Sequence, residues 1–395
     1  MIKYARLLFL ASLLSTAPFA ALAAEPIEIG AIGPFTGGSA PMGVDMLYGM
    51  KLAVKDINAA GGVLGRPIVL AERNDQANND RGAKIGEELT EQHRVVAAVG
   101  FVNTGVTLAA APYFQEARIP LIVAVSTGSL ITKLFAPPEY RENYIFRMSA
   151  STAIEVATIA NQVVSQGYKK VVLLADTTAY GQVGRQDLLV ALAKRGITPV
   201  ANEKFNLGDA DMTEQLTRAR AAGADVILTY GIGPELAQIA NDREKLGWPV
   251  PIIGSWTLSM SNFIDGAGKN GEGTIMPQTF IETGDTPRRA EFIHKFHAAY
   301  NVTRMNSPPA AAQGYDAVYV LAAAITQAGS IDGSKIREAL NHLQKPIEGV
   351  VTTYDHPFSP ENHEAIAITE IVMGVVKDGR VVRLPVQSAA KITTE

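Results

Sequence analysis

Polar side chains that could hold an anion follow the ends of buried strands in this sequence. The apolar run Val95 to Val99 ends at Gly100, and the turn Asn103-Thr104-Gly105 leads directly into an alanine-rich helical segment. The first amides of a helix have no partner inside it and carry the positive end of the helix dipole, so they attract a carboxylate. The hydroxyl of Thr104 can add a hydrogen bond. The pattern predicts an anion-binding turn.

A second turn of this kind follows the next apolar run, Leu121 to Val125, at Ser126-Thr127-Gly128. Taken alone, each hydroxyl is more often a helix cap than a ligand contact. Ligands of open parallel sheets sit at the edge where the strands end, so several such turns are expected to converge there. Convergence favours an anion pocket, and a side chain can both cap a helix and bind a ligand.

Aromatic residues stand at strand ends in both halves of the chain. Tyr180 follows the apolar strand 171–175, Tyr230 ends the strand 226–230, and Trp256 follows a short strand at 252–253. Core packing explains any single aromatic residue about equally well. Their recurrence where loops face a cleft favours ligand contact for Tyr180 and Trp256. The candidate ligand-binding residues are Met42, Phe101, Asn103, Thr104, Ser126, Thr127, Tyr180, Tyr230, Ile232, Trp256 and Phe280.

The signals for catalysis and for metal binding are poor. There is no cysteine and no G-x-S-x-G turn around a serine. Glu291, His294 and His297 could gather on one turn of a helix, but a solvated helix face explains this spacing better than a metal site does. His356 and His363 form a second weak cluster, for which a surface loop is the better interpretation. We expect no enzyme activity and no cofactor.

The segment Gly266-Ala267-Gly268-Lys269-Asn270-Gly271 matches the G-x-G-x-x-G letters of dinucleotide sites. It neither follows a clear strand nor opens a clear helix, so the required context is missing. The sequence also lacks the G-x-x-x-x-G-K-[ST] phosphate loop.

The first 24 residues have the pattern of a cleaved signal peptide. Lys3 and Arg6 form the basic start, Leu7 to Leu14 the apolar core, and Ala21-Leu22-Ala23 the cleavage pattern, so cleavage is expected after Ala23 or Ala24. Losing both cations changes the formal net charge from -4 to -6, which argues against nucleic acid as a partner. Without cysteine the chain has neither disulfides nor a thiol for lipid attachment. A periplasmic protein without a membrane anchor is expected.

The elements repeat in the order strand, loop, helix. Strands are predicted at 27–33, 68–70 and 95–99, with an amphipathic helix that carries Leu47, Met50, Val54 and Ile57. The helix after the second strand is predicted to be capped near Asp80. The same order restarts at 171–175, which predicts two α/β halves, each with a parallel sheet covered on both faces. Pro112 should kink its helix or delay its regular part.

The segment beyond Met276 does not start a third unit of this kind. Helices are predicted at 288–300, at 315–328 and after Ser334. A strand at 350–354 and a hairpin, 365–377 with 380–384, would follow. These late elements are expected to tie the two halves together.

Almost the whole mature chain resembles the leucine/isoleucine/valine-type periplasmic binding proteins that serve ABC importers. The similar segments are IGAIGPFTG, KLAVKDINAAGGVLGRPI, AVGFVNTG, PLIVAVST, ADTTAYGQ, TYGIGPE and QGYDAVYVLAAAI, of which KDINAAGGVLGRPI is the most diagnostic. The resemblance implies a type I binding-protein fold, in which two doubly wound lobes joined by a three-segment hinge close on a small molecule. The implied lobes are 25–147 with 279–352, and 148–278 with 353–395. It also implies a monomer that docks on a membrane permease.

The resemblance further implies a carboxylate site at Asn103-Thr104 and Ser126-Thr127, faced from the other lobe by Tyr180 and Ile232. Amino-acid binders of this family hold the ligand's ammonium with an acidic residue, but the matching place reads Gly254-Ser255-Trp256-Thr257. A buried ammonium without an anionic partner is costly. We therefore predict a carboxylate solute without an α-ammonium, such as an aromatic acid. Branched-chain amino acids, amides, and a sensory role for a signalling partner are the alternatives.

Overall fold

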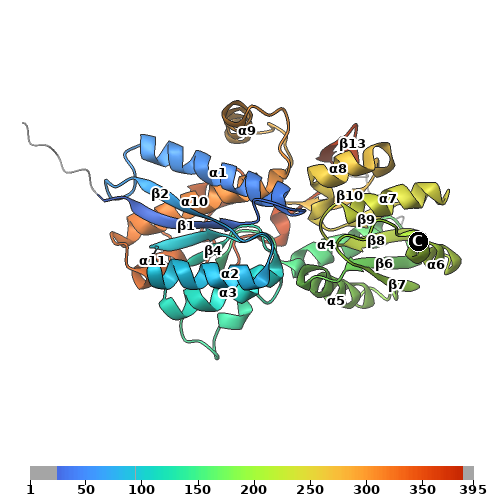
Figure 1. The fold of residues 1–395 in the computed structure, drawn as a ribbon, viewed down its shortest axis with the longest axis horizontal. Coiled ribbons are helices and arrows are strands. Elements are labelled where there is room, and N and C mark those ends of the chain that lie inside the picture. The colour runs from blue at the N-terminus through green and yellow to red at the C-terminus, as the bar shows by residue number, and fades with distance from the viewer. Residues whose placement is uncertain (1–24, 94, 386–395) are drawn as a thin grey trace, which may run out of the picture.

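The computed structural model describes residues 25–93 and 95–385, which form two lobes side by side (Figure 1). The predicted signal peptide lies outside the described residues. The sheet of the first lobe is parallel throughout. Its strands run in the order β2 (Ile68–Asn74), β1 (Ile27–Gly33), β3 (Ala97–Gly100), β4 (Leu121–Val123) and β5 (Ile145–Arg147). β3 and β4 are entirely buried, as their apolar runs predict for a sheet covered on both faces.

Helices cover both faces of this sheet (Figure 1). On one face lie α1 (Ala40–Ala59) and α10 (Pro308–Ala328); on the other lie α2 (Asn79–Glu87) and α3 (Thr104–Ala117). Glycines let α1 and α10 approach closely, because a Cβ at Gly49 would lie 2.0 Å from the carbonyl oxygen of Ala311. The late helices α9 (Pro287–Tyr300) and α11 (Gly333–Asn341) also belong to this lobe. Tyr300 of α9 stacks on Tyr48 of α1, with ring centroids 3.7 Å apart.

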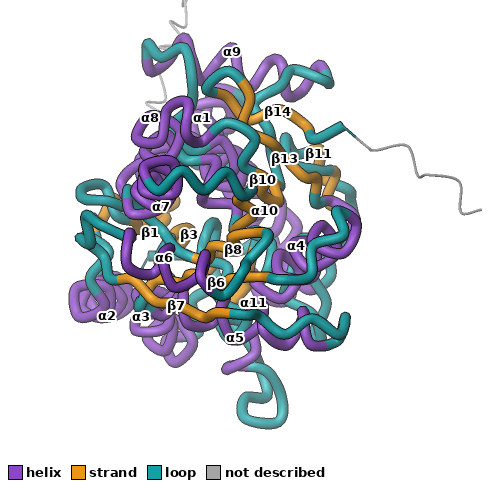
Figure 2. Tube along the Cα trace, turned by 90° about the vertical axis from the view of Figure 1, so that its right-hand side faces the viewer, coloured by secondary structure: helices purple, strands orange, loops and turns teal. Residues whose placement is uncertain are grey.

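The sheet of the second lobe combines a parallel part with an antiparallel edge. Figure 2 faces this lobe and shows β7, β6, β8, β10 and β13 in succession. β13 and β14 pair antiparallel at the edge next to β10, whereas the other strands are parallel. The full order is β14 (Arg380–Arg383), β13 (Val372–Lys377), β10 (Ile275–Gln278), β9 (Ile252–Gly254), β8 (Val226–Tyr230), β6 (Val171–Asp176) and β7 (Ala201–Phe205). Its helices are α4 (Thr152–Ser165), α5 (Ala179–Ala193), α6 (Thr213–Ala221), α7 (Glu235–Lys245) and α8 (Ser261–Ala267).

The cap of α2, predicted near Asp80, is Asn78, whose side-chain oxygen accepts from the amide of Arg81 at 2.9 Å. Several other predicted details were wrong. α3 runs unbroken from Thr104 through Pro112, so its regular part does not begin late. The hairpin begins at Val372 instead of 365, and the strand expected at 350–354 is limited to β12 (Thr353–Tyr354), paired with β11 (Ile347–Glu348). β5, which has only three residues, and α4, whose buried residues recur at helical spacing, were not predicted.

Three chain segments pass between the lobes. A buried ion pair attaches the third of them to the first lobe. The guanidinium of Arg147, which is fully buried, donates to both carboxylate oxygens of Glu364 at 2.6 Å and to the carbonyl of Gly128 at 2.6 Å. Backbone hydrogen bonds also join Arg147 to His363 and Ala365. We propose that the lobes divide after residues 147 and 278, as the sequence suggests, but that the third crossover follows residue 366 instead of 352.

No helix within residues 25–93 and 95–385 is long and apolar enough to cross a membrane.

Neutralising one partner of the buried ion pair should cost much of the stability of the fold. In Glu364→Gln the guanidinium of Arg147 stays buried without a counter-charge, and we expect a loss of about 3–5 kcal/mol in the free energy of unfolding. Urea denaturation measures it. Glu214→Gln is the control, because Glu214 also pairs with an arginine, Arg218, but is solvent-exposed. Equal midpoints for the two variants would contradict the role of the buried pair.

His363 should make the fold sensitive to acid. Burial lowers the pKa of His363 from 6.5 to about 4, and its ring stacks on Phe146 while Nδ1 donates to the carbonyl of Ile145 at 2.9 Å. The fold favours the neutral ring, so this stabilisation is complete above pH 6.5 and is lost as the pH falls toward 4. Relative to His363→Phe, the wild type should lose roughly 3 kcal/mol between these pH values. A pH-independent difference in urea denaturation would contradict this.

Candidate functional site

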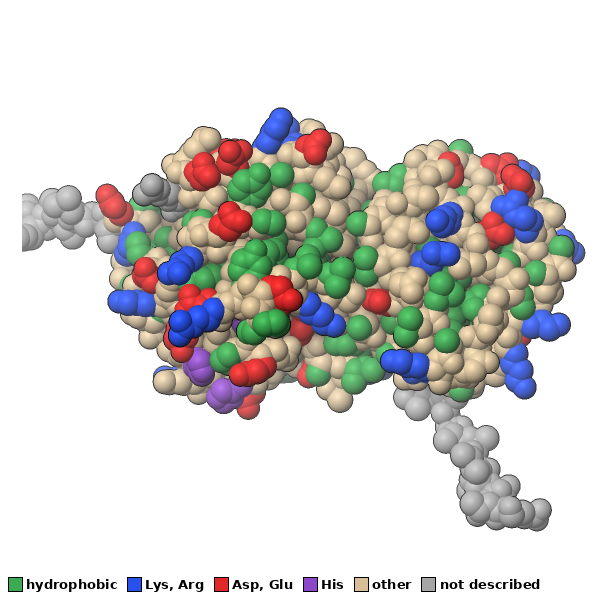
Figure 3. All heavy atoms as spheres, turned by 90° about the horizontal axis from the view of Figure 1, so that it is seen from below, with side chains coloured by type: hydrophobic (Ala, Val, Ile, Leu, Met, Phe, Trp, Pro, Cys, Tyr) green, Lys and Arg blue, Asp and Glu red, His purple; other side chains and the backbone are tan. Residues whose placement is uncertain are grey.

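A cleft of about 530 Å³ lies between the two lobes. The seam between them is visible as a waist in the space-filling view (Figure 3). One wall comes from the first lobe, residues 77–80 and 103–105, and the other comes from the second lobe, residues 177–180 with Leu207 and Ile232. The cleft therefore lies at the carboxyl ends of strands from both parallel sheets, where such sheets bind ligands.

The wall of the first lobe is built around the predicted anion-binding turn. A sharp turn leads from β3 into α3, because Gly100 (φ +154°) and Phe101 (φ +62°) adopt backbone conformations that reverse the chain. Asn103 is the N-cap residue of α3 but makes no side-chain cap; its Nδ2 donates to Ser39 at 3.0 Å and its Oδ1 is buried without a partner. Thr104 begins the helix and is 1% exposed. The turn thus contains a buried hydrogen-bond acceptor, Asn103 Oδ1, that no donor of the described residues satisfies.

The second predicted turn lies against the first. Ser126 Oγ donates to Thr104 Oγ1 at 3.4 Å. A Cβ at position 128 would lie only 2.4 Å from Thr104 Cγ2. Glycine at this position therefore allows the two turns to pack closely. The carbonyl of Thr127 accepts from the amide of Thr152 at 2.7 Å, so this turn is also linked to the start of α4 in the second lobe. The structure brings Thr104 and Ser126 together, whereas the hydroxyl of Thr127 lies 3.3 Å from that of Thr152.

Asp176 organises the wall of the second lobe. Its Oδ1 accepts from the amide and the hydroxyl of Thr178, at 2.9 and 2.5 Å, and its Oδ2 accepts from the amide of Ile232 at 2.9 Å. Thr178 in turn caps α5, at whose first turn Tyr180 lies. Burial raises the pKa of Asp176, against the effect of these hydrogen bonds. One buried carboxyl therefore fixes the loops that carry Tyr180 and Ile232.

Two buried polar atoms on this side have no protein partner among the described residues. They are the hydroxyl of Tyr180, which is 6% exposed, and Nε1 of Trp256, which is 8% exposed. The Tyr180 ring lies 4.8 Å from that of Tyr230. Buried polar groups are almost always hydrogen-bonded in native proteins. Unused polar atoms at a cleft between lobes are what a site for a polar solute requires.

The sequence analysis missed Glu155, on the first turn of α4. This residue is 2% exposed, and its Oε2 accepts from the hydroxyl of Tyr230 at 2.6 Å. Burial raises its pKa from 4.5 to about 7, although the bond from Tyr230 acts in the other direction. Glu155 and Trp256 also line, with Thr127, a small cavity of about 10 Å³, roughly the space of one water molecule. No strand-end pattern marks Glu155, because it comes from a helix.

Of the eleven predicted residues, only Asn103, Thr104, Tyr180 and Ile232 line this cleft. Ser126 and Tyr230 are fully buried, and Thr127 and Trp256 line a separate small cavity.

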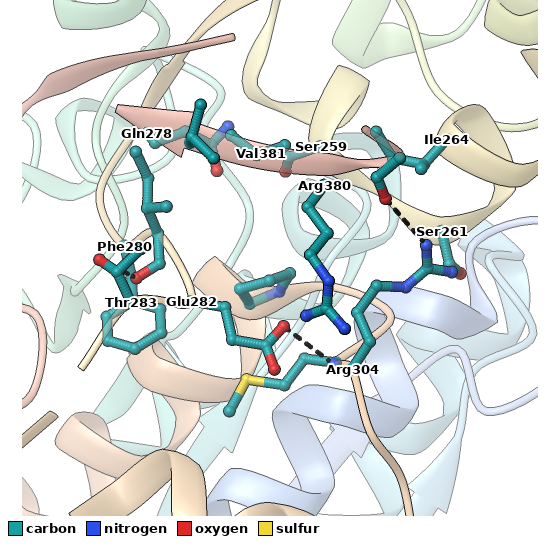
Figure 4. A pocket seen from close by; sticks show the side chains of 15 residues that line it. Ser259, Ser261, Ile264, Gln278, Phe280, Glu282, Thr283, Arg304, Arg380 and Val381 are labelled. Carbon is teal, nitrogen blue, oxygen red and sulfur yellow. Dashed lines mark hydrogen bonds between the residues drawn. The ribbon is translucent and has the colours of Figure 1, made fainter. Parts of the chain in front are cut away.

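The other three, Met42, Phe101 and Phe280, have other surroundings. The ring of Phe101 packs on Phe114 inside the first lobe, and Met42 is buried in its core. Phe280 packs on Phe292 and lines a separate cavity of about 130 Å³ (Figure 4). In that cavity Arg304 donates to the carbonyl of Gly379, and Glu282 accepts from the amide of Met305. For these three side chains the structure favours a packing role.

Two of the histidines singled out in the sequence, His297 and His356, pair with carboxylates. His363 is buried, so the surface loop predicted for it was wrong. Nε2 of His297 lies 2.5 Å from a carboxylate oxygen of Glu282, and Glu291 pairs with Lys295. His356 pairs with its neighbour Asp355 on the surface. Within the described residues, no three metal-ligating side chains cluster together. Gly266-Gly271 spans the end of α8 and a short 3-10 turn, without the strand-to-helix context of a dinucleotide site.

The family model described as periplasmic binding protein matches residues 26–380. The chain belongs to the periplasmic binding protein family. A curated relative, Leu/Ile/Val-binding protein homolog 3 of Brucella melitensis, is 28% identical over 343 residues, which cover 86% of this chain and 89% of the relative. The predicted type I fold, with two doubly wound lobes, is thereby confirmed.

Solved structures of periplasmic binding proteins share the arrangement of lobes. The branched-chain amino acid binding protein LivJ of Streptococcus pneumoniae, in complex with isoleucine, is 25% identical with a TM-score of 0.76, covering 91% of this chain and 100% of that one. A solute-binding protein of R. palustris, in complex with benzoate, is 19% identical with a TM-score of 0.78, covering 91% and 95%. The latter likeness concerns the fold alone. The family match and the curated relative support the role of a substrate-binding protein of an ABC transporter, and not of an enzyme, for this chain.

Asp176→Asn should loosen the wall of the second lobe. An amide offers only one oxygen, so either Thr178 or Ile232 loses its acceptor, and we expect a loss of about 1–3 kcal/mol in unfolding free energy. Hydrogen exchange at the amides of Thr178 and Ile232 should quicken. Asp225→Asn is the matched control, because Asp225 also accepts two backbone amides, those of Lys169 and Lys170, but at the opposite ends of the strands. Unchanged exchange in Asp176→Asn would contradict the assignment.

Proposed function

We propose that this protein captures a small solute carrying a carboxylate in the interlobe cleft and delivers it to a membrane permease. The single observation that carries the proposal is the contact of Ser126 with Thr104 at the start of α3, where Thr104 and Asn103 line the cleft. Helix amides and hydroxyl groups together stabilise a carboxylate. A permease partner follows from the family, and we propose that the protein works as a monomer without a membrane anchor.

The lobes already touch across the cleft, which supports capture by closure. Ser129, beside the second turn, donates to Asp187 of α5 at 2.8 Å, and Asn262 of α8 donates to the carbonyl of Gly38 at 3.2 Å. Both contacts are polar and exposed enough to break at little cost. A solute that contacts both walls binds the closed state better than the open one, and it therefore shifts the population toward closure.

Two solute classes suit the cleft. Aromatic acids suit the rings of Tyr180 and Trp256, and the sequence analysis favoured them because residues 254–257 carry no acidic side chain. Glu155, however, supplies a buried carboxylate beside Trp256 from another element, which favours an amino acid as the second candidate. The isoleucine bound by the Streptococcus pneumoniae relative is a solute of that class.

Calorimetric titration with matched acids and amides tests the carboxylate. We expect benzoate or L-isoleucine to bind, and benzamide and isoleucinamide to bind at least about a hundredfold more weakly, because the amides lack the negative charge. Thr104→Val, which removes one hydroxyl at nearly constant shape, should weaken acid binding by about tenfold to a hundredfold. Thr90→Val is the control, since Thr90 is a buried threonine bonded to the carbonyl of Gly86 within its own helix. Amides that bind as tightly as acids would refute the proposal.

A further inference from the structure

We infer that Glu155 is a specificity-determining residue that accepts a hydrogen bond from a polar hydrogen on the solute, beside the solute's carboxylate. The inference rests on the proposed function, because it assumes that a carboxylate occupies the two turns of the first lobe. It adds that the preferred solute has a second polar group, and it names the side chain that receives this group.

The carboxylate of Glu155 is incompletely satisfied within the fold. Oε2 accepts a 2.6 Å bond from Tyr230, but Oε1 has only a 3.4 Å approach from the amide of Trp256. A hydrogen bond of that length is weak. A buried carboxylate that lacks donors is costly, which is consistent with the raised pKa of Glu155. The other groups that face it are the hydroxyl of Thr127, the hydroxyl of Tyr180 and, as a stabilising cation, Arg147.

Buried carboxylates with a structural role are treated differently in this protein. Asp316 of α10, which is fully buried, accepts from the amides of Val350 and Val351 at 2.8 and 2.9 Å and from the hydroxyl of Tyr354 at 2.9 Å. Both of its oxygens are occupied by donors at short distances. Glu155 shares the tyrosine partner but not the two strong amide bonds. Its open oxygen distinguishes it from a purely structural carboxylate.

The position of Glu155 suits a donor close to the solute's carboxylate. It lines the same small cavity as Thr127, a residue of the second turn, and as Trp256, whose Nε1 is buried without a partner. Tyr180, with its own unpartnered hydroxyl, is connected to Glu155 through the ring of Tyr230. The solute's donor group would therefore lie within a few atoms of its carboxylate and among aromatic rings.

An ammonium and a hydroxyl share the required chemistry, since each presents a polar hydrogen to a carboxylate. The two sources differ in charge. An ammonium would pair with ionised Glu155 and gain from the surrounding rings, whereas a hydroxyl needs only an acceptor oxygen. Replacing Glu155 by glutamine keeps an acceptor oxygen and removes the charge, so this variant separates the two sources.

Calorimetric titration of wild type and Glu155→Gln with paired solutes tests the inference. L-isoleucine is paired with 3-methylpentanoate, which lacks the ammonium, and 4-hydroxybenzoate with benzoate, which lacks the hydroxyl. In at least one pair the wild type should prefer the donor-bearing solute by about tenfold or more. Glu155→Gln should reduce an ammonium preference by about thirtyfold or more, and a hydroxyl preference by less than about tenfold.

Asp316→Asn is the matched control, because it neutralises a comparably buried, tyrosine-bonded carboxylate away from the cleft. This variant should keep the wild-type preference for the donor-bearing solute even if its unfolding temperature is lower. Should Glu155→Gln fail to fold, the carboxyl of Glu155 in the wild type can be followed by NMR with labelled glutamate. Its pKa should fall on binding an ammonium-bearing solute and stay in place with the solute that lacks the donor.

The outcomes separate this inference from the proposed function. If acids bind and amides do not, but the wild type does not discriminate within either pair, the carboxylate site stands and the role of Glu155 is refuted. Equal weakening of all acids by Glu155→Gln, with the preference kept, also refutes it. If no acid binds, the proposed function fails, and the inference fails with it.

Discussion

The buried guanidinium of Arg147 holds three parts of the molecule near the cleft in fixed positions relative to one another. It extends from β5, holds the third crossover through Glu364, and donates to the carbonyl of Gly128, directly after the second anion-binding turn. A bidentate, charge-assisted contact of this kind fixes distance and orientation together. The third crossover between the lobes is thus anchored next to the polar turn.

The arrangement also explains why the strand-end residues of the first lobe could be predicted from sequence. Asn103, Thr104, Ser126 and Thr127 each follow a short, wholly apolar run, and such runs are buried strands whose ends meet at one edge of a parallel sheet. Local pattern and global topology agree there. Tyr180 was predicted for the same reason, whereas Ile232 was implied by the family resemblance. Asp176, at the end of β6, holds the loops of both residues. What these residues bind remains a proposal, since their chemistry and not a bound molecule supports it.

The surroundings of other side chains could not be predicted from their position relative to the end of a strand. Phe101 follows β3 as the site residues do, but its backbone has φ +62°, which directs the ring back to Phe114 in the core. Glu155 lies on the same helix face as Val156, Ile159 and Val163 of α4, but a glutamate is normally solvated. Only the packing of α4 against β8 and Trp256 makes it a buried carboxylate. Sequence pattern predicts faces and edges, whereas desolvation of a charge depends on tertiary contacts.

The unpartnered polar atoms of the second lobe tie solute recognition to the stability of the closed state. Tyr180 Oη, Trp256 Nε1 and the open oxygen of Glu155 are desolvated by the fold without full compensation by protein groups. Each such group costs about 1–3 kcal/mol when it stays unpaired. A solute that satisfies several of them recovers this free energy only in the closed cleft. The same desolvation free energy gives selectivity. A solute that lacks one of the matching groups leaves one of these polar atoms unpaired and therefore binds more weakly.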